Sequence, residues 1–220
     1  SSTSFVIIDT LEGNLVSGDY SEDADSDVRR TLSLVLLVTD KSYTVGEFNR
    51  VWIDKYVRVY MGQKDSRTRD IYWYKKGIYV IDSAETTYSI EDNSISLSCS
   101  DLVVTMDGTH GGDIDATTIK IPAGSIIREA MIQTLTQLGG WGNYRVDDLG
   151  EYTCLEGIVE DYLKRRESYP DWNQVPYDLE FDVGTTVWDI IVKLRDLYPG
   201  FECFFDEDGT FICQRIPNCE

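Results

Sequence analysis

The clearest alternation of apolar and polar residues runs from Thr86 to Asp101, T-T-Y-S-I-E-D-N-S-I-S-L-S-C-S-D. A period of two is typical of a half-buried β-strand, and here it continues on both sides of Asp92-Asn93. If these two residues form the loop of a hairpin, the apolar side chains share one face and the serines share the other. The register that follows joins three pairs of residues: Ile90 with Ile95, Tyr88 with Leu97, and Thr86 with Cys99.

The rest of the first half also favours strands, at residues 5–8, 31–39, 56–61 and 71–82, with a bulge or bend at Gly77. Residues 43–53 are expected to be irregular or a short helix, and residues 101–106 a single helical turn. The strand at 31–39 is apolar at both alternating sets of positions, so cover on both of its faces is expected. A helix or a neighbouring subunit could supply that second cover.

The second half changes to a helical period. Apolar or small residues recur at helical spacing over 126–138 and 186–198, and glycine-containing stops follow both segments. Ser125 is the predicted N-cap of the first helix, and Thr186 with Asp189 the predicted capping box of the second. Each helix follows a short strand, I-K-I or L-E-F, and precedes another strand-like segment. The two units match at an offset of 60 residues, which suggests a duplicated strand-helix-strand unit.

These patterns predict an α+β fold with two domains. Residues 1–110 are expected to form a mostly antiparallel β-barrel or sandwich, tube-like in character, and residues 117–220 a smaller α/β domain. The glycine-rich segment 108–117 is the expected boundary. A further helix is expected at 154–166, where the basic run 164–166 would complement its C-terminal dipole.

The composition argues against some classes of partner. A net charge of −19, shared by both halves, does not suit nucleic-acid binding, which requires basic surfaces. No apolar run is long enough to span a membrane, so no membrane insertion is expected. The five cysteines are scattered without metal-ligand spacing, as in a protein made in a reducing cytosol.

Candidate chemistry was sought and yields no catalytic, cofactor-binding or metal-binding residues. Asp23, Asp25 and Asp27 have the spacing of a calcium loop, but Val28 and Leu34 occupy the positions of its required Gly and Glu. The single histidine, His110, lies in a glycine-rich linker with no nucleophile motif nearby. The chain is therefore expected not to be an enzyme and to bind no cofactor.

The chain closes with the segment 201–214, F-E-C-F-F-D-E-D-G-T-F-I-C-Q, which predicts a hairpin with Gly209 in the left-handed position of a three-residue loop. Asp206 then pairs with Thr210, and Cys203 lies opposite Cys213. The expectation is that these cysteines pack as small apolar side chains, and a disulfide stays open as the alternative.

Six stretches of the sequence carry a resemblance to one family. They are R-R-T-L-S-L (29–34), V-R-V-Y-M-G (57–62), W-Y-K-K-G-I-Y-V-I (73–81), S-I-S-L-S-C-S-D (94–101), V-P-Y-D-L-E-F-D-V-G-T-T-V-W-D-I-I (175–191) and Y-P-G-F-E-C-F-F-D-E-D-G-T-F-I-C-Q-R-I-P (198–217). The first four resemble the N-terminal part of prophage tail and baseplate hub proteins of Gram-positive bacteria, and the last two resemble the next segment of the same proteins. The resemblance covers most of the chain, apart from roughly 110–120 and 150–172. It contains no catalytic motif.

The resemblance implies a structural role in a virion tail made in the bacterial host cytoplasm. Such hubs are trimers that join the tail tube or distal tail ring to a spike or fibres. The chain ends directly after a predicted strand, so it is expected to be a fragment of a longer hub that trimerises when complete, even if the fragment is monomeric.

Two alternatives stay open. A carbohydrate-binding β-module would display a row of Trp and Tyr over a groove. A glycan hydrolase would display two carboxylates facing each other across a cleft, at least one with a raised pKa.

Overall fold

The computed structural model describes residues 5–10, 15–38, 43–53, 55–88, 93–147, 173–197 and 200–216. Its fold is α+β, which confirms the predicted class. The chain divides into two compact units. The β unit consists of Thr3–Thr105 together with Phe204–Thr210, and the α/β unit consists mainly of Met106–Cys203 and Phe211–Glu220.

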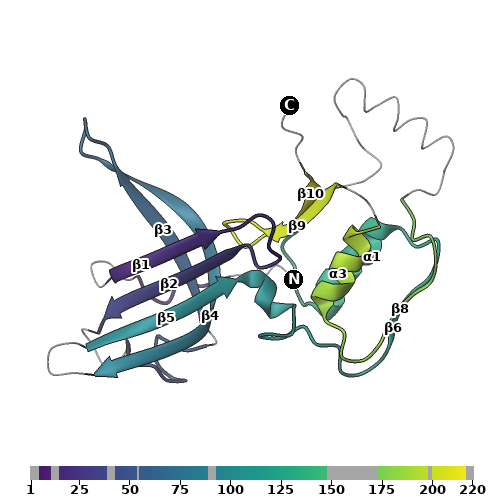
Figure 1. The fold of residues 1–220 in the computed structure, drawn as a ribbon, viewed down its shortest axis with the longest axis horizontal. Helices are drawn as coiled ribbons and strands as arrows, with labels where there is room; N and C mark the ends of the chain where they lie inside the picture. The colour runs from purple at the N-terminus through teal and green to yellow at the C-terminus, as the bar shows by residue number, and fades with distance from the viewer. Residues whose placement is uncertain are drawn as a thin grey trace. The chain divides into compact units, whose positions relative to one another are not determined.

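The β unit is built on a five-stranded antiparallel sheet with the order β1-β2-β5-β4-β3. The sheet curls into a half-barrel, with β1 and β3 as its two edge strands (Figure 1). A single 3₁₀ turn, η2 (Leu102–Thr105), follows β5, as the sequence predicts. The strands are β1 (Leu15–Glu22), β2 (Arg30–Leu37), β3 (Tyr56–Lys64), β4 (Ile71–Tyr88) and β5 (Asn93–Asp101).

One face of this sheet carries the core of the β unit. Alternate residues of β2 are buried, and so are the apolar residues of β5 and the centre of β4. On the other face of β2, Val35 is only half-buried and Leu37 is 43% exposed. The described residues of this chain thus bury one face of β2, whereas the sequence predicts that both faces are covered. The core cluster comprises Leu32, Leu34, Leu36, Val51, Tyr79, Ile81, Ile95, Leu97 and Cys99.

The predicted hairpin exists, but its predicted register is wrong. The faces are correct, because Ile95, Leu97 and Cys99 are buried while Ser96 and Ser98 are exposed. The pairing, however, is shifted along β4, by four residues for Ile95 and Leu97 and by five for Cys99, which lies beyond a bulge between Ile81 and Ser83. The observed partners are Thr86 for Ile95, Ala84 for Leu97 and Ile81 for Cys99. The even shift at Ile95 and Leu97 leaves these pairs on their predicted face. Of the predicted loop, Asn93 is instead the first residue of β5 and pairs with Tyr88, while Asp92 lies outside the described residues, as does Ile90.

Two further predictions about the β unit need correction. Residues 5–8 form no strand in the structure, and β1 lies where the sequence predicts none, since it contains Gly18-Asp19, a pair typical of turns. β1 is exposed along nearly all of its length, so it carries no alternating apolar pattern, and it forms because β2 offers it a pairing edge. The bulge at Gly77 is confirmed, since Val59 pairs with Gly77 while Tyr60 pairs with Lys75.

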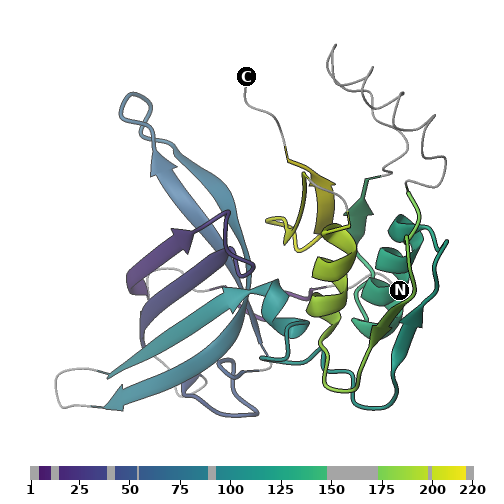
Figure 2. The ribbon, with the colours of Figure 1, turned by 45° about the vertical axis from the view of Figure 1, so that its right-hand side comes forward.

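The α/β unit contains the duplicated unit that the sequence suggested. β6 (Ile119–Ile121) leads through a turn into α1 (Ile127–Gln133), and β8 (Leu179–Phe181) leads through an equivalent turn into α3 (Val187–Arg195). The starts of the two helices are 60 residues apart. β6 and β8 pair antiparallel, centred on Lys120 and Glu180, and the two helices lie side by side (Figures 1 and 2).

Backbone hydrogen bonds repeat this symmetry. Each turn before a helix is held by an extended segment of the other repeat, through three bonds that match in kind. For the first turn these are Gly124 N to Val175 O, Val175 N to Ser125 O, and Ile127 N to Asn173 O. For the second they are Gly184 N to Ile114 O, Ile114 N to Thr185 O, and Val187 N to Gly112 O. Gly124 and Gly184 also share a positive φ, of 84° and 92°.

The helices differ in their ends. The predicted capping box of Thr186 and Asp189 is confirmed at the start of α3. The predicted cap Ser125 is wrong, because its hydroxyl donates to the carbonyl of Pro122 and the N-cap is Ile126. The predicted helix at 126–138 continues beyond α1 as a π-helical turn, η3 (Thr134–Leu138). Within it, Thr134 and Thr136 donate to carbonyls four residues back, which is a known cause of helix distortion.

The sheet β7-β10-β9 joins β7 (Tyr144–Val146) to two strands from the C-terminal end of the chain, and β7 runs parallel to β10 (Phe211–Arg215). The predicted terminal hairpin joins β9 (Phe201–Phe205) to β10, with Asp206 and Thr210 paired across the loop and Gly209 at φ 77°. Cys203 and Cys213 are both buried, and neither forms a disulfide.

Candidate functional site

No described group of three or more His, Cys, Asp or Glu side chains is arranged to hold a metal ion. Asp23, Asp25 and Asp27 are exposed, and Asp23 instead accepts a hydrogen bond from the backbone of Asp25. His110 is exposed in a bend. The basic run 164–166 and the cysteines Cys154 and Cys219 lie outside the described residues. No helix in the described ranges has the length and apolar character needed to cross a membrane.

The β unit contains a buried ion pair between Arg30 and Asp101, whose side chains are 4% and 1% exposed. Arg30 Nε donates to Asp101 Oδ2 at 2.8 Å, and Arg30 Nη2 donates to the carbonyl of Phe205 at 2.6 Å. Burial raises the pKa of Asp101, while Arg30 and the backbone amides of Val103 and Leu102 act against that rise. Because the carboxylate faces a guanidinium rather than a second carboxylate, this pair fits a structural role.

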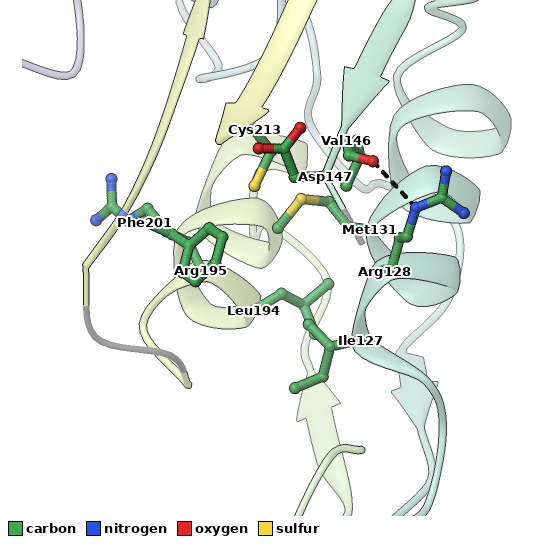
Figure 3. Close-up of a pocket in the computed structure, with 9 residues that line it drawn as sticks. All are labelled: Ile127, Arg128, Met131, Val146, Asp147, Leu194, Arg195, Phe201 and Cys213. Atoms are coloured by element: carbon green, nitrogen blue, oxygen red, sulfur yellow. Dashed lines mark hydrogen bonds between the residues drawn. The ribbon is translucent and has the colours of Figure 1, made fainter. Parts of the chain in front are cut away.

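Two cavities in the α/β unit were considered as ligand sites. The first, between the helices and the strands β7 and β10, has a volume of about 10 Å³, which is room for a single water. Arg128 closes part of it by donating from Nε to the carbonyl of Val146 at 3.0 Å (Figure 3). The second is a groove of about 300 Å³ along β6, α1 and η3, at the small end of ligand pockets. Glu129 is its one lining carboxylate, so no carboxylate pair faces this groove.

The most unusual surface is the far end of the β3–β4 hairpin, beyond the bulge at Gly77. We call residues 60–75 the ribbon. All of them are exposed except the half-buried Asp65, although six are large and apolar. The ribbon extends past the other strands of the sheet (Figures 1 and 2). The six are Tyr60 (44% exposed), Met61 (48%), Ile71 (51%), Tyr72 (50%), Trp73 (65%) and Tyr74 (52%).

Apolar side chains occupy both faces of the ribbon. The register pairs Gly62 with Trp73, and residues two apart share a face. Tyr60, Ile71 and Trp73 therefore lie on one face, and Met61, Tyr72 and Tyr74 on the other. A Cβ atom at Gly62 would come within 2.9 Å of Trp73 Cζ3, which shows that the indole lies over this glycine.

Local interactions hold the tip of the ribbon together. Asp65 N donates to the carbonyl of Asp70 at 2.9 Å, and Asp65 Oδ1 accepts from the backbone of Arg67 at 2.7 Å and of Thr68 at 3.3 Å. Arg69 takes the left-handed conformation, with φ 65°, that closes the loop. At the base of the ribbon Lys75 forms an ion pair with Asp208, also within the β unit. The ribbon is thus a defined structure rather than a loose loop.

The hairpin differs in charge from the rest of the chain. Segment 56–76 carries six basic and two acidic residues, a net charge of +4. The whole chain carries −19, so everything outside this segment carries −23. An exposed, basic and aromatic ribbon on an otherwise acidic protein is suited to contact with another macromolecule.

The sequence analysis identified this segment as strands but missed the ribbon as a site. A signal was present, because I-Y-W-Y at residues 71–74 is apolar without alternation. Such a run fits either a strand buried on both faces or one that projects from the fold. The choice depends on what lies beside it, which only the structure provides.

No family model matches the chain. No curated protein matches it either. Among solved structures, it is similar to a tail protein from Neisseria meningitidis MC58, with 12% identity and a TM-score of 0.48, over 89% of this chain and 44% of that one. It is also similar to the 43 kDa tail protein of prophage MuSo2 from Shewanella oneidensis, with 12% identity and a TM-score of 0.46, over 90% and 47%. The chain spans less than half of either protein.

Proposed function

We propose that this chain is a structural subunit of a phage tail or tail-like injection device. Its place is the tip or baseplate hub, where it joins the tail tube or distal tail ring to a spike or fibres, and its full-length form is a trimer. The observation that carries the proposal is the ribbon, six large apolar side chains exposed on both faces of two paired strands. An isolated two-stranded hairpin is at best marginally stable in water, so this one is suited to contact with a neighbouring subunit.

Three further features support an assembling role. The half-barrel has two edge strands, β1 and β3, each of which pairs with a single neighbour among the described strands. The second face of β2 leaves Leu37 exposed. The residue patterns of β2 to β5 and of β8 to β10 are those that resemble tail and baseplate hub proteins.

The strong negative charge is also compatible with a conduit for DNA, because binding to phosphates requires Lys and Arg. Net repulsion between copies should make the assembly of the full-length protein more complete as salt is added, because the screening length falls to about 8 Å near physiological ionic strength. Light scattering of the full-length protein at low and high salt tests this expectation. A monomer at every salt concentration contradicts the trimer.

Electron microscopy of particles from the strain that encodes this chain tests the proposed place. Gold-labelled antibodies against the chain should mark one end of the tail, and deletion of the gene should give tails without tips. Complementation with a Trp73→Ser, Tyr74→Ser variant should fail. A matched control, Tyr177→Ser, removes a similarly exposed aromatic from the α/β unit and should complement. Labelling along the whole tail, or complete tips without the gene, contradicts the proposal.

A carbohydrate-binding module is the second candidate, because Tyr72, Trp73 and Tyr74 could stack on sugar rings. The ribbon presents these rings on opposite faces, whereas a sugar-binding row shares one face. Calorimetric titration with bacterial cell-wall oligosaccharides distinguishes the two functions. Binding that is lost in Trp73→Ala would favour the module, and we expect no binding.

A further inference from the structure

The two edges of the half-barrel sheet carry opposite charges. At the β1 edge, residues 15–27 contain five acidic residues and no basic residue, and all five acidic side chains are exposed. They lie on β1 and the turn that follows it: Asp19, Glu22, Asp23, Asp25 and Asp27. At the β3 edge lies the hairpin 56–76, which carries a net charge of +4. Three strands separate these edges in the order of the sheet.

We infer that the basic ribbon of one copy of this chain binds the acidic β1 edge of a second copy. The inference rests on the proposed function, because it names the neighbour that an assembling subunit needs. The contact joins unlike surfaces, so each copy keeps one free ribbon and one free edge after binding a neighbour. Head-to-tail contacts of this kind generate a closed ring when the rotation between copies closes.

Apolar surface and unpaired backbone at both edges fit this contact. Leu15 and Val16 at the start of β1 are 53% and 63% exposed. Edge strands present unpaired amides and carbonyls, which are a template for pairing with another chain. On the ribbon, the exposed Lys64 pairs with Ile71, and the exposed Arg67 lies in the turn that joins the two strands. Each surface therefore combines an apolar part with charges that complement those of the other.

A nucleic acid is the other class of molecule that a basic, aromatic ribbon could attract. The remainder of the chain carries −23, which would repel a polyanion, whereas the same acidity supplies a complementary surface on a second copy. The observations therefore favour a second copy.

Zero-length cross-linking tests the contact directly. A carbodiimide joins an amine to a carboxylate only where the two touch, and Lys64 is an exposed amine on the ribbon. In an equal mixture of ¹⁴N- and ¹⁵N-labelled chains, we expect isotopically mixed peptides that link Lys64 to the acidic residues at 19–27. Links confined to one isotope, or mixed links from Lys64 to other regions only, would overturn the inference.

Charge reversal provides a second test with an internal rescue. Lys64→Glu with Arg67→Glu takes the net charge of segment 56–76 from +4 to 0 and should lower the yield of mixed cross-links between other amines and carboxylates of the two edges by about tenfold, because the attraction between unlike charges is lost. Asp19→Lys with Asp25→Lys takes the net charge of residues 15–27 from −5 to −1 and should have the same effect. All four changes in one chain exchange the charges at these positions, which restores attraction where the positions contact each other, and should return part of the yield. Glu85→Lys with Asp115→Lys, two exposed acids elsewhere, is the matched control and should have little effect.

The outcomes separate this inference from the proposed function. If mixed cross-links form but the chain is absent from tail particles, the contact between copies is supported and the role in the tail is contradicted. If the antibodies label the tail tip but no mixed cross-links form, or the fourfold variant restores no cross-linking, the role in the tail is supported and the contact between copies is contradicted. Duplex or single-stranded DNA binding at physiological salt that depends on Lys64 and Arg67, without any mixed cross-link, would assign the ribbon to nucleic acid instead.

Discussion

The single strand β4 contains two halves of similar composition and opposite environment. Ile78, Tyr79, Val80 and Ile81 are all buried, with exposed fractions of 4% or less. Residues 71–74 on the same strand, I-Y-W-Y, are all at least 50% exposed. Both halves are aromatic and β-branched, as strand residues commonly are. The difference teaches that burial in this protein is decided by the neighbouring strands and not by composition.

Gly77 marks the change between the halves. Its φ of 124° and the register shift opposite Val59 and Tyr60 direct the ribbon away from the half-barrel. On the C-terminal side of Gly77, β4 pairs with both β3 and β5 and contacts η2. On its N-terminal side, residues 71–75 pair with β3 alone among the described strands. The exposure of the ribbon's large apolar side chains to water is unfavourable in free energy unless a partner buries them. The comparison can be tested through each half separately.

The largest expected effect distinguishes two tyrosines on this strand. Tyr79→Ala should lower the free energy of unfolding by about 3–5 kcal/mol, the usual cost of truncating a buried aromatic. Its ring is fully buried and its hydroxyl donates to the carbonyl of Lys76 at 2.7 Å. Tyr74→Ala, on the exposed ribbon, should change stability by about 0.5 kcal/mol or less. Urea unfolding of both variants checks this, and equal costs would mean that the ribbon is buried within the chain.

The buried face of β5 offers the next test. Leu97→Ala should cost about 2–5 kcal/mol, because the leucine is 4% exposed and the core closes such cavities only partly. Ser96→Ala, one residue earlier on the exposed face, is the matched control and should be close to neutral. Chemical denaturation followed by circular dichroism measures both. A cost for Leu97→Ala below about 0.5 kcal/mol would reverse the assigned faces.

The junction itself should respond to added volume. Gly77→Ala would place a Cβ 2.6 Å from Arg30 Nη1, at a φ that residues with side chains rarely adopt. Arg30 is held by Asp101 and cannot move freely, so we expect a loss of about 1–3 kcal/mol. Gly62→Ala, which meets the exposed side chains of Trp73 and Ile71, should have a smaller effect on stability and should alter tryptophan fluorescence. If both variants unfold like the parent, Gly77 is not the constraint described here.

The smallest effect concerns alkaline pH. Burial raises the pKa of Tyr79 from 10.0 to about 12. Between these values the folded chain keeps a proton that the unfolded chain releases, so stability should fall as pH rises through this window. Tyr79→Phe should show a shallower fall. Burial also raises the pKa of Cys99 to about 12, so Cys99 contributes to the loss of stability at high pH. The Tyr79→Phe variant retains that contribution. Urea titrations between about pH 9 and pH 11.5 measure the slopes, and identical slopes would exclude a contribution from Tyr79.

The elements with strong local signals were predicted best. The capping box of Thr186 and Asp189 and the loop at Gly209 are set by residues three or four apart, and both are present. The offset of 60 residues is visible in the sequence because both repeats use the same turn chemistry around Gly124 and Gly184. Ser125 satisfied the rule for a cap but bonds to Pro122 instead, because several local partners compete for one hydroxyl.

Elements that depend on distant partners were predicted less well. The register of β4 and β5 follows a long pairing that aligns Ile81 with Cys99 and Tyr79 with Asp101, far from the loop used to predict it. The strand β1 has almost no buried residue and exists through pairing with β2. The candidate site could not be predicted, because strands buried on both faces and strands exposed on both faces have the same apolar pattern.

The sequence by itself determined which residues form strands and helices in most of the chain, which face of β5 is buried, and where the two repeats begin. Those features follow from side-chain periodicity and from turn residues, which act over a few positions. Only the tertiary structure decided the register, the open half-barrel with its oppositely charged edges, the burial of Arg30 against Asp101, and the projection of the ribbon. These depend on contacts between residues far apart in the chain, and no local pattern encodes which distant segment lies next to which.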